Sequence, residues 1–320
     1  MDSSENLIIK AYAADLLKNQ VSYLENQIEG LIYDENIEFL HHTRVMSRRI
    51  RNTISVFAPY FGKKNAKRWF AAFRKLTKSL TQMRDLDVQI LFLENKISEI
   101  KEQKLLTGLQ RIMLRKQQQR EKKQETVHAA ILQFEKTKVL SEIKTFIEKN
   151  PMDQENFTPT ASLVQLGKDE VDTLIKTCFS FVPFITNPDQ KEPLHDLRIA
   201  IKNLRYTTEL FKPILPELDA SLTTMKKFQD DLGEIHDCDV WIDNLDSFME
   251  KEKRKIQNFY GQSGPFNFIK PGIVFLMDQL KSRKIDIHNQ FLTRWHEEYQ
   301  HEFWANLQLV FEEKLQSIEN

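Results

Sequence analysis

The sequence contains few of the residues that interrupt helices. Glycine occurs 8 times and proline 10 times in 320 residues, so the chain has few signals for sharp turns. Hydrophobic residues make up 41% of the chain and charged residues 29%, as in water-soluble globular proteins. The length allows one large domain or two ordinary ones. The composition therefore predicts long helices and few strands.

Cysteines and long apolar runs are also scarce. The two cysteines, Cys178 and Cys238, are too few for a disulfide framework, and they favour buried thiols in a reducing compartment. No apolar run approaches the ~18 residues of a membrane-spanning helix. The N-terminus is acidic and has no basic segment before an apolar core, unlike a signal peptide. We therefore expect a cytoplasmic protein without a membrane partner.

Acidic residues are missing from one long stretch, although the whole chain has 46 basic and 46 acidic residues. No aspartate or glutamate occurs from Phe39 to Met83. A local excess of positive charge attracts anions whatever the net charge of the protein. The cations of this stretch are Arg44, Arg48, Arg49, Arg51, Lys63, Lys64, Lys67, Arg68, Arg74, Lys75 and Lys78.

Apolar residues recur at helical spacing along most of the chain. In the first half this predicts helices over about 7–30, from an N-cap at Asp34 to 57, over 66–82 and over 85–102, and then a long polar helix to 150. In the second half it predicts helices over about 163–181, 194–215 and 220–232, one from Asp237, and a last one from 273 to the C-terminus. The segment 151–162, with two prolines and no periodicity, predicts a linker between domains 1–150 and 163–320.

Two motifs occur twice in the same order. "HHTRVMSRRIR" (41–51) matches "HDLRIAIKNLR" (195–205) at an offset of 154 residues. "RKLTKSLTQMRDLDV" (74–88) matches "KKFQDDLGEIHDCDV" (226–240) at an offset of 152 residues. Two matches at nearly one offset indicate an internal duplication, and the period is too long for a solenoid repeat. We therefore predict an all-α fold of two pseudo-symmetric helical bundles.

The first motif of each half places cations in a row on one side of a helix. Apolar residues form the neighbouring stripe, so each helix packs by one face and exposes cations on the next. Because like charges at helical spacing repel one another, such rows suggest an anionic partner, and arginine and lysine suit phosphate. Internal pairing with Asp85, Asp87, Asp237 and Asp239 is the alternative, although these acids also suit the first turn of a helix.

The doubled motif, the "RDLD" and "HDCD" segments and the helical duplication resemble the CHAD domain, the conserved histidine α-helical domain. The resemblance covers almost the whole chain. It implies two four-helix bundles with a basic central pore that binds inorganic polyphosphate, and association with polyphosphate granules. Because the sequence has no Gly-rich phosphate loop, CxxC pair or nucleophile elbow, we expect no cofactor and no enzymatic activity. Arg49 has the uncharged Asn203 at the equivalent position, and Lys75 and Lys227 are additions outside the first motif. The binding residues implied in this way are His41, Arg44, Arg48, Arg49, Arg51, Lys75, His195, Arg198, Lys202, Arg205 and Lys227.

Three other classes of function stay open. One is an interaction scaffold with the polar helix around 101–123 as its docking surface. The pairs His195-Asp196 and His236-Asp237 are also found in metal-dependent phosphohydrolases of the HD type, but His236 corresponds to Arg84 in the first half, which is no metal ligand. A basic channel could equally bind RNA or DNA by charge. The cationic rows, however, lack the interleaved aromatic residues on which single-stranded bases stack.

Overall fold

The computed structural model describes residues 3–33 and 36–319, and every regular element in these ranges is a helix. This confirms the all-helical prediction. Short 3₁₀ segments occur at Val182–Phe184, Pro216–Leu218 and Gly264–Phe268. The α-helices are α1 (Ser3–Tyr33), α2 (Ile37–Val56), α3 (Ala58–Phe61), α4 (Lys63–Glu99), α5 (Gln103–Glu121), α6 (Gln124–Glu135), α7 (Val139–Lys149), α8 (Ala161–Phe179), α9 (Lys191–Phe211), α10 (Asp219–Tyr260), α11 (Lys270–Gln300) and α12 (Phe303–Glu319).

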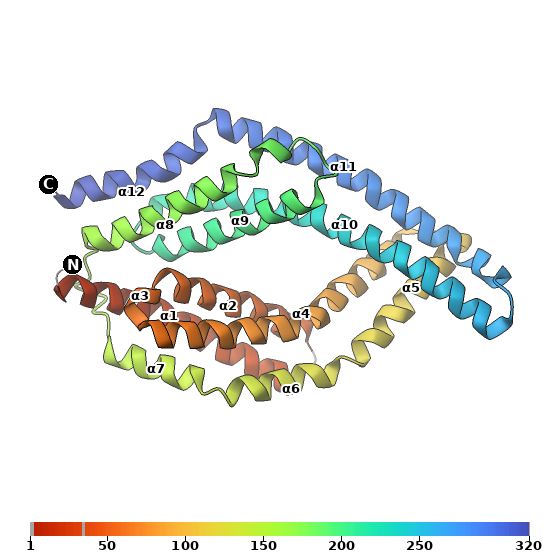
Figure 1. The fold of residues 1–320 in the computed structure, drawn as a ribbon, viewed down its shortest axis with the longest axis horizontal. Helices are drawn as coiled ribbons and strands as arrows, with labels where there is room; N and C mark the ends of the chain where they lie inside the picture. Colours follow the sequence, from red (N-terminus) through yellow and green to blue (C-terminus); the bar gives the residue numbers. More distant parts are fainter. Residues whose placement is uncertain (1–2, 34–35, 320) are drawn as a thin grey trace.

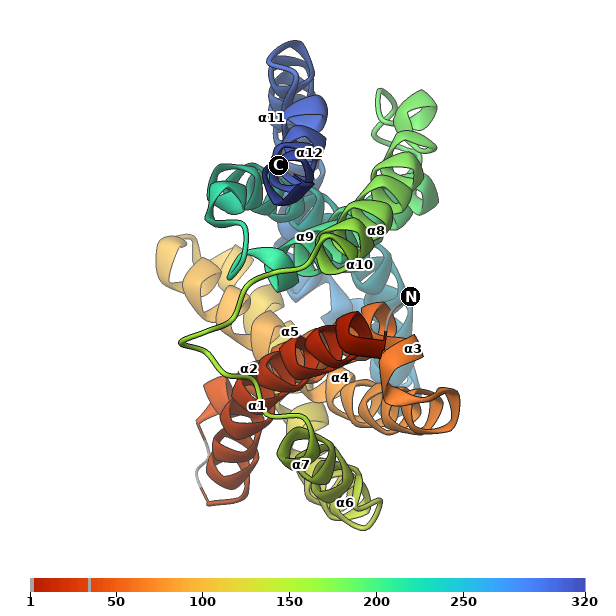
Figure 2. The ribbon, with the colours of Figure 1, turned by 90° about the vertical axis from the view of Figure 1, so that its left-hand side faces the viewer.

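The helices form two layers that converge at the end opposite the two termini (Figure 1). One layer contains α1–α4, α6 and α7, and the other contains α8–α12. The layers meet where α2 packs against α9, and α5 packs against α11 at the converging end. Figure 2 shows the segment after α7 crossing from one layer to the other. Residues 151–160 of this segment contain no helix.

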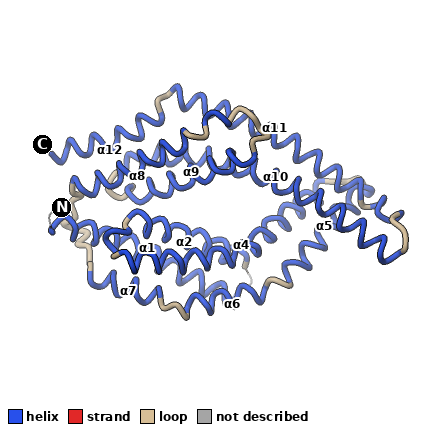
Figure 3. The backbone as a smooth tube through the Cα atoms, in the orientation of Figure 1, coloured by secondary structure: helices blue, strands red, loops and turns tan. Residues whose placement is uncertain are grey.

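Two predicted helix boundaries were wrong. The regions 66–82 and 85–102 belong to one helix, α4, and the regions 220–232 and from 237 onward belong to α10 (Figure 3). A single aspartate does not end a helix when the apolar stripe continues on both sides of it. Asp85, Asp87, Asp237 and Asp239 therefore lie in helix interiors and not in first turns.

Two long predicted helices are in fact divided. The polar helix expected up to residue 150 consists of α5, α6 and α7, and Lys138 before α7 has a left-handed φ of 57°. The helix expected from 273 to the C-terminus is divided into α11 and α12, where Glu302 has a φ of 54°. Asp34, the predicted N-cap of the second helix, lies outside the described residues. Asn36 caps α2, because its side chain accepts a hydrogen bond from the backbone N–H of Glu38 at 2.9 Å.

The main apolar core runs through both layers. Phe57 and Phe211 lie in contact across them, with ring centroids 6.1 Å apart, and the Tyr12 hydroxyl donates a hydrogen bond to the Leu210 carbonyl at 2.5 Å. A second core, formed by α4, α5, α10 and α11, fills the converging end. The continuous core fixes α2 against α9, and these two helices carry the basic motifs. In the described part of the chain, no helix is both long and apolar enough to cross a bilayer.

Candidate anion-binding cavity

A cavity of about 440 Å³ lies between α2 and α4 of one layer and α9 and α10 of the other. It is bounded on one side by the contact of α2 with α9, where the Asn52 amide donates a hydrogen bond to the Thr207 hydroxyl at 3.2 Å. The cavity combines cations, two carboxylates, histidines and apolar side chains. Its lining residues are His41, Arg44, Val45, Arg48, Thr81, Arg84, Asp85, Val88, Gln89, Arg198, Lys202, His236, Asp237, Val240 and Trp241.

Lys202 lies among several arginines at this cavity. Burial and the charges of Arg48, Arg198, Arg44 and Arg205 lower the pKa of its ammonium group to about 7. No carboxylate of the described residues lies within 4 Å of its Nζ. The positive charges around Lys202 are therefore not neutralised by a carboxylate in contact with its ammonium group.

The arginines beside Lys202 are partly buried and make few hydrogen bonds within the protein. Arg44 donates to the backbone carbonyl of Thr77 at 3.2 Å. Burial lowers the pKa of Arg44 to about 10, although the charge of Asp85 opposes this shift. Burial also lowers the pKa of Arg198, against the opposing effect of Asp237. Both guanidinium groups remain charged at neutral pH, and their remaining donors are available to an anion.

Two carboxylates line the same cavity without forming ion pairs among residues 3–33 and 36–319. Burial raises the pKa of both Asp85 and Asp237 against the opposing charges of arginines. The charge of Asp85 also raises the pKa of Asp237, which lines the same cavity. They offset part of the positive charge of Arg44, Arg84 and Arg198 without reaching Lys202.

The motif histidines lie at the edge of the cavity. His41 is one of its lining residues, and His195 contacts His236 with 3.1 Å between the two Nδ1 atoms. Burial, Arg198, His195 and Lys202 lower the pKa of His236 to about 4, so its ring is neutral at pH 7. One of the two rings therefore donates a hydrogen bond to the other. Within the described ranges, no three histidine, cysteine or acidic side chains are grouped as ligands for a metal ion.

The structure brings five of the eleven predicted binding residues into this cavity and places six outside it. The five are His41, Arg44, Arg48, Arg198 and Lys202. Sequence reasoning missed Arg84 and His236, although they occupy matching positions in the repeated second motif. The residues outside the cavity are Arg49, Arg51, Lys75, His195, Arg205 and Lys227.

Arg49 and Arg205 are engaged by a carboxylate of α9. Arg49 lies 3.1 Å from Glu209, and Arg205 donates to Glu209 at 2.6 Å and to the Gln229 side chain at 3.0 Å. The Arg205 guanidinium carbon also lies 4.9 Å from the ring centroid of Tyr206. Both arginines line a second hollow next to the meeting point of α2 and α9.

The other three cations outside the cavity lie on the surfaces of their helices. The Arg51 guanidinium carbon lies 5.6 Å from the ring centroid of Phe70, and burial with the charges of Arg48 and Arg74 lowers the pKa of Arg51. Lys75 on α4 and Lys227 on α10 are exposed. They extend the basic surface beyond the cavity without lining it.

These features define an all-helical protein with a cation-lined cavity between two layers of helices. The family model of the CHAD domain matches residues 15–246, and the chain belongs to this family. No curated protein sequence matches the chain.

Two solved structures share the fold. The crystal structure of the CHAD domain from the plant Ricinus communis has a TM-score of 0.62 and 18% identity, and the alignment covers 90% of this chain and 91% of that one. PptA from Streptomyces chartreusis has a TM-score of 0.59 and 15% identity, with 92% and 99% covered. At these identities the similarity concerns the fold.

Proposed function

We propose that the protein binds inorganic polyphosphate in the cavity between α2, α4, α9 and α10, and that it does so as a binding module without catalysis. The observation that carries this proposal is the position of Lys202 among Arg44, Arg48 and Arg198, with no carboxylate within 4 Å of its ammonium group. Membership of the CHAD-domain family supports the same function.

A linear polyphosphate carries negative charge along a flexible chain and needs no base recognition. The arginine forks of Arg44, Arg48 and Arg198 suit phosphate oxygens, and Lys202 contributes a point charge. Binding would release counterions from the polymer, so the affinity should fall steeply as salt is added, as for DNA phosphates. The remaining predicted cations then act as a second, outer group that guides the polymer to the cavity by charge. These cations are Arg49, Arg51, Lys75, Arg205 and Lys227.

The cavity is proposed to be the basic pore of a duplicated fold. Its lining supports this reading because residues of the two halves occur in matched pairs at the two repeat offsets. The pairs are Arg44 with Arg198, Arg48 with Lys202, Arg84 with His236, Asp85 with Asp237, Val88 with Val240 and Gln89 with Trp241. In this proposal 1–150 and 163–320 are the two duplicated units, and the protein is cytoplasmic and associates with polyphosphate granules.

Titration calorimetry with long-chain polyphosphate at low and moderate salt tests the proposal. The wild type should bind tightly and lose affinity steeply with salt, and Arg48→Ala/Lys202→Ala should bind at least about tenfold more weakly. The control Lys122→Ala/Lys136→Ala removes the same two charges from exposed positions far along the chain and should bind like the wild type.

Three results would contradict the proposal. One is the absence of binding by the wild type. Another is an unchanged affinity in Arg48→Ala/Lys202→Ala. The third is displacement of polyphosphate by single-stranded RNA at equal phosphate concentration, which would favour the nucleic-acid alternative.

A further inference from the structure

The last turn of α10 and the 3₁₀ segment Gly264–Phe268 after it expose three aromatic side chains, Phe259, Tyr260 and Phe268. The turn between α10 and α11 lies at the converging end of the molecule, far from both termini (Figure 1). The exposed fractions are 81% for Phe259, 61% for Tyr260 and 73% for Phe268. Phe259 and Phe268 are the two most exposed large hydrophobic side chains of the described residues. Phe259 and Tyr260 contact each other, with ring centroids 4.8 Å apart, and large apolar groups exposed in this way indicate an interaction surface.

The aromatic side chains project from a firmly packed base. Phe266 and Ile269 of the same loop are buried in the second core, so Phe268 lies on the outer side of a well-anchored turn. Gly261, with a φ of 70°, ends α10 in the left-handed conformation that favours glycine. The exposure of the rings thus comes from an ordered turn and not from an unpacked one.

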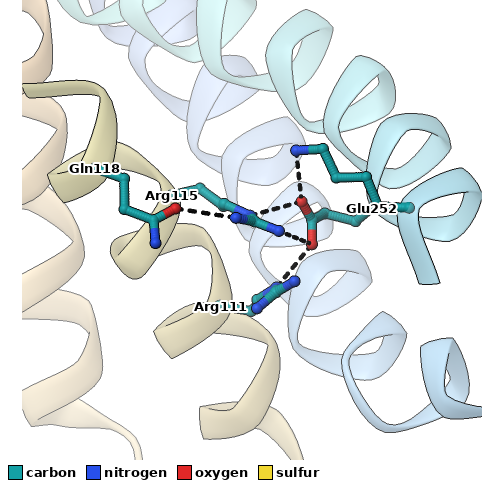
Figure 4. Close-up of polar contacts among 5 residues, drawn as sticks. Arg111, Arg115, Gln118 and Glu252 are labelled. Atoms are coloured by element: carbon teal, nitrogen blue, oxygen red, sulfur yellow. Dashed lines mark hydrogen bonds and ion pairs between the residues drawn. The ribbon is translucent and has the colours of Figure 1, made fainter. Parts of the chain in front are cut away.

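A buried carboxylate fixes α10 to α5 below this turn. Glu252 has a side chain only 1% exposed, and it accepts hydrogen bonds from Arg111 at 2.7 Å, from Arg115 at 2.8 Å and from Lys255 at 3.2 Å (Figure 4). α5 also packs directly against the start of α11. The two segments are so close that a Cβ on Gly108 or Gly272 would overlap backbone atoms of the other segment. The hairpin is therefore a rigid projection.

Cations lie just behind the aromatic rings on α10. Lys255 precedes Phe259 by four residues and Lys253 precedes Tyr260 by seven, so each pair shares a side of the helix. At 1.5 Å per residue, these cations lie ~6 to ~10 Å behind the rings along the helix axis. Lys251, Lys253 and Arg254 are exposed and have no ion pair in the described part of the chain, and Lys270 continues the cationic surface on α11.

The order of these groups favours a lipid surface over nucleic acid. Aromatic side chains at the tip with cations one to two turns behind match the layers of a bilayer interface, where apolar groups enter to a depth of ~5 to ~10 Å and anionic headgroups lie above them. Single-stranded nucleic acid instead needs aromatic and basic residues interleaved along one groove. Peripheral contact of this kind requires no membrane-spanning helix, and the described part of the chain contains none. It differs from the expectation of a protein without a membrane partner, because that expectation rested on the absence of a spanning segment.

We propose that the tip of the α10–α11 hairpin docks on membrane surfaces that contain anionic phospholipid, with Phe259, Tyr260 and Phe268 entering the interface and the cations of α10 contacting headgroups. This contact is separate from the cavity, which lies on other parts of α10 and on α2, α4 and α9.

Co-sedimentation with vesicles tests the proposal. The full chain should sediment with vesicles of equal parts phosphatidylcholine and phosphatidylglycerol, and not with phosphatidylcholine alone. Phe259→Ser/Phe268→Ser should bind the anionic vesicles at least about tenfold more weakly, and so should Lys251→Gln/Lys253→Gln/Arg254→Gln. The control Leu7→Ser/Leu132→Ser changes two exposed apolar residues elsewhere and should bind like the wild type.

A second pair of measurements separates this surface from the cavity. Arg48→Ala/Lys202→Ala should still sediment with anionic vesicles, and the tip variants should still bind polyphosphate. The proposal is overturned if the wild type does not sediment, if the aromatic variant binds vesicles unchanged, or if Arg48→Ala/Lys202→Ala abolishes vesicle binding. It is also overturned if the tip variants lose self-association or RNA binding while vesicle binding stays unchanged.

Discussion

Arg49 of α2 and Glu209 of α9 form an ion pair between the two layers, with 3.1 Å from Nη2 to Oε2. Glu209 also accepts a hydrogen bond from Arg205 of its own helix, at 2.6 Å. One carboxylate therefore partly neutralises one arginine of each basic motif. Both arginines line the second hollow together with Glu209, so we expect Glu209 to limit how much of the basic surface can engage an anion.

Replacing Glu209 with glutamine should raise the affinity for polyphosphate severalfold at low salt, because Arg49 and Arg205 would be freed. Stability should fall by about 1–2 kcal/mol, because water screens the interlayer pair, whose side chains are 38% and 22% exposed, while the pair with Arg205 is only 15% and 22% exposed. Calorimetric titration and thermal melting measure the two effects. Glu102→Gln, which removes the exposed partner of Lys104 away from both hollows, is the control and should leave the affinity unchanged. A lower affinity in Glu209→Gln would mean that the carboxylate positions the arginines for the ligand.

The all-helical class and the cations that line the cavity could be predicted from the sequence. Which carboxylate each of the other arginines pairs with could not. Arg44 and Arg198 follow from the repeated motif, because helical spacing places them on one side of each helix. The engagement of Arg49 depends on the packing of α2 against α9, which no local pattern encodes. The pair of Arg205 with Glu209, by contrast, could have been predicted, because Glu209 follows Arg205 by four residues on the same helix.

The acidic residues of the second motif show why helix boundaries were missed. Asp87 pairs with Arg120 of α5 at 2.6 Å, and Asp239 pairs with Lys284 of α11 at 2.8 Å. These interhelical contacts stabilise aspartates in helix interiors, where intrinsic propensity alone disfavours them. Tertiary contacts therefore outweigh the local preference on which the predicted boundaries depended.

Lys202 should make stability depend on pH. Its pKa is lowered from 10.5 to about 7 by burial and neighbouring arginines, so the folded state bears the cost of the charged ammonium below about pH 7. That cost is relieved as the pH rises from about 7 toward the ordinary pKa, because the folded state releases the proton first. Lys202→Met should therefore raise the melting temperature more at about pH 6 than at about pH 9. An equal gain at both pH values would contradict this reading.

The same group should couple polyphosphate binding to proton uptake. A bound polyanion favours the charged ammonium and raises the pKa of Lys202, so binding above about pH 7 should take up a proton and weaken as the pH rises. Calorimetry in buffers of different ionisation enthalpy measures the uptake. Lys202→Arg keeps a permanent charge at this position, so it should bind polyphosphate without taking up this proton.

At Gly108, where α5 packs against the start of α11, no residue larger than glycine should fit without destabilising the fold. A Cβ on Gly108 would overlap the Ile269 carbonyl and crowd Gly272, so Gly108→Ala should destabilise the fold by about 1–3 kcal/mol. Polyphosphate affinity should persist, since no lining residue of the cavity belongs to α5. In Gly233→Ala the nearest atom, Arg198 Nε, would lie 3.7 Å from the new Cβ, and this helical substitution should stabilise the fold by about 0.5–1 kcal/mol. Denaturant unfolding compares the two variants, and a Gly108→Ala protein as stable as the wild type would contradict the close crossing.

Glu252 should connect the stability of the projecting hairpin to acid pH. Burial alone would raise the pKa of Glu252, but hydrogen bonds from Arg115, Arg111 and Lys255 outweigh burial and lower that pKa below its ordinary value of 4.5. A carboxylate with a lowered folded-state pKa contributes stability above its unfolded pKa, and this contribution is lost as the pH falls through the folded pKa. Glu252→Gln should therefore lose about 1–3 kcal/mol at neutral pH, because two partly buried guanidinium groups lose their counter-charge.

The difference between wild type and Glu252→Gln should shrink as the pH falls through the lowered folded-state pKa of Glu252, because the wild-type carboxyl then also becomes neutral. Denaturant unfolding at neutral and acid pH measures it. Glu250→Gln is the matched control, because Glu250 is exposed on the same helix and has no ion pair within the described ranges, and its substitution should change little at either pH. If the two variants were equally stable at neutral pH, the Glu252 network would contribute nothing to the attachment of α5. The rigidity of the hairpin tip would then depend on the apolar core and the glycine crossing alone.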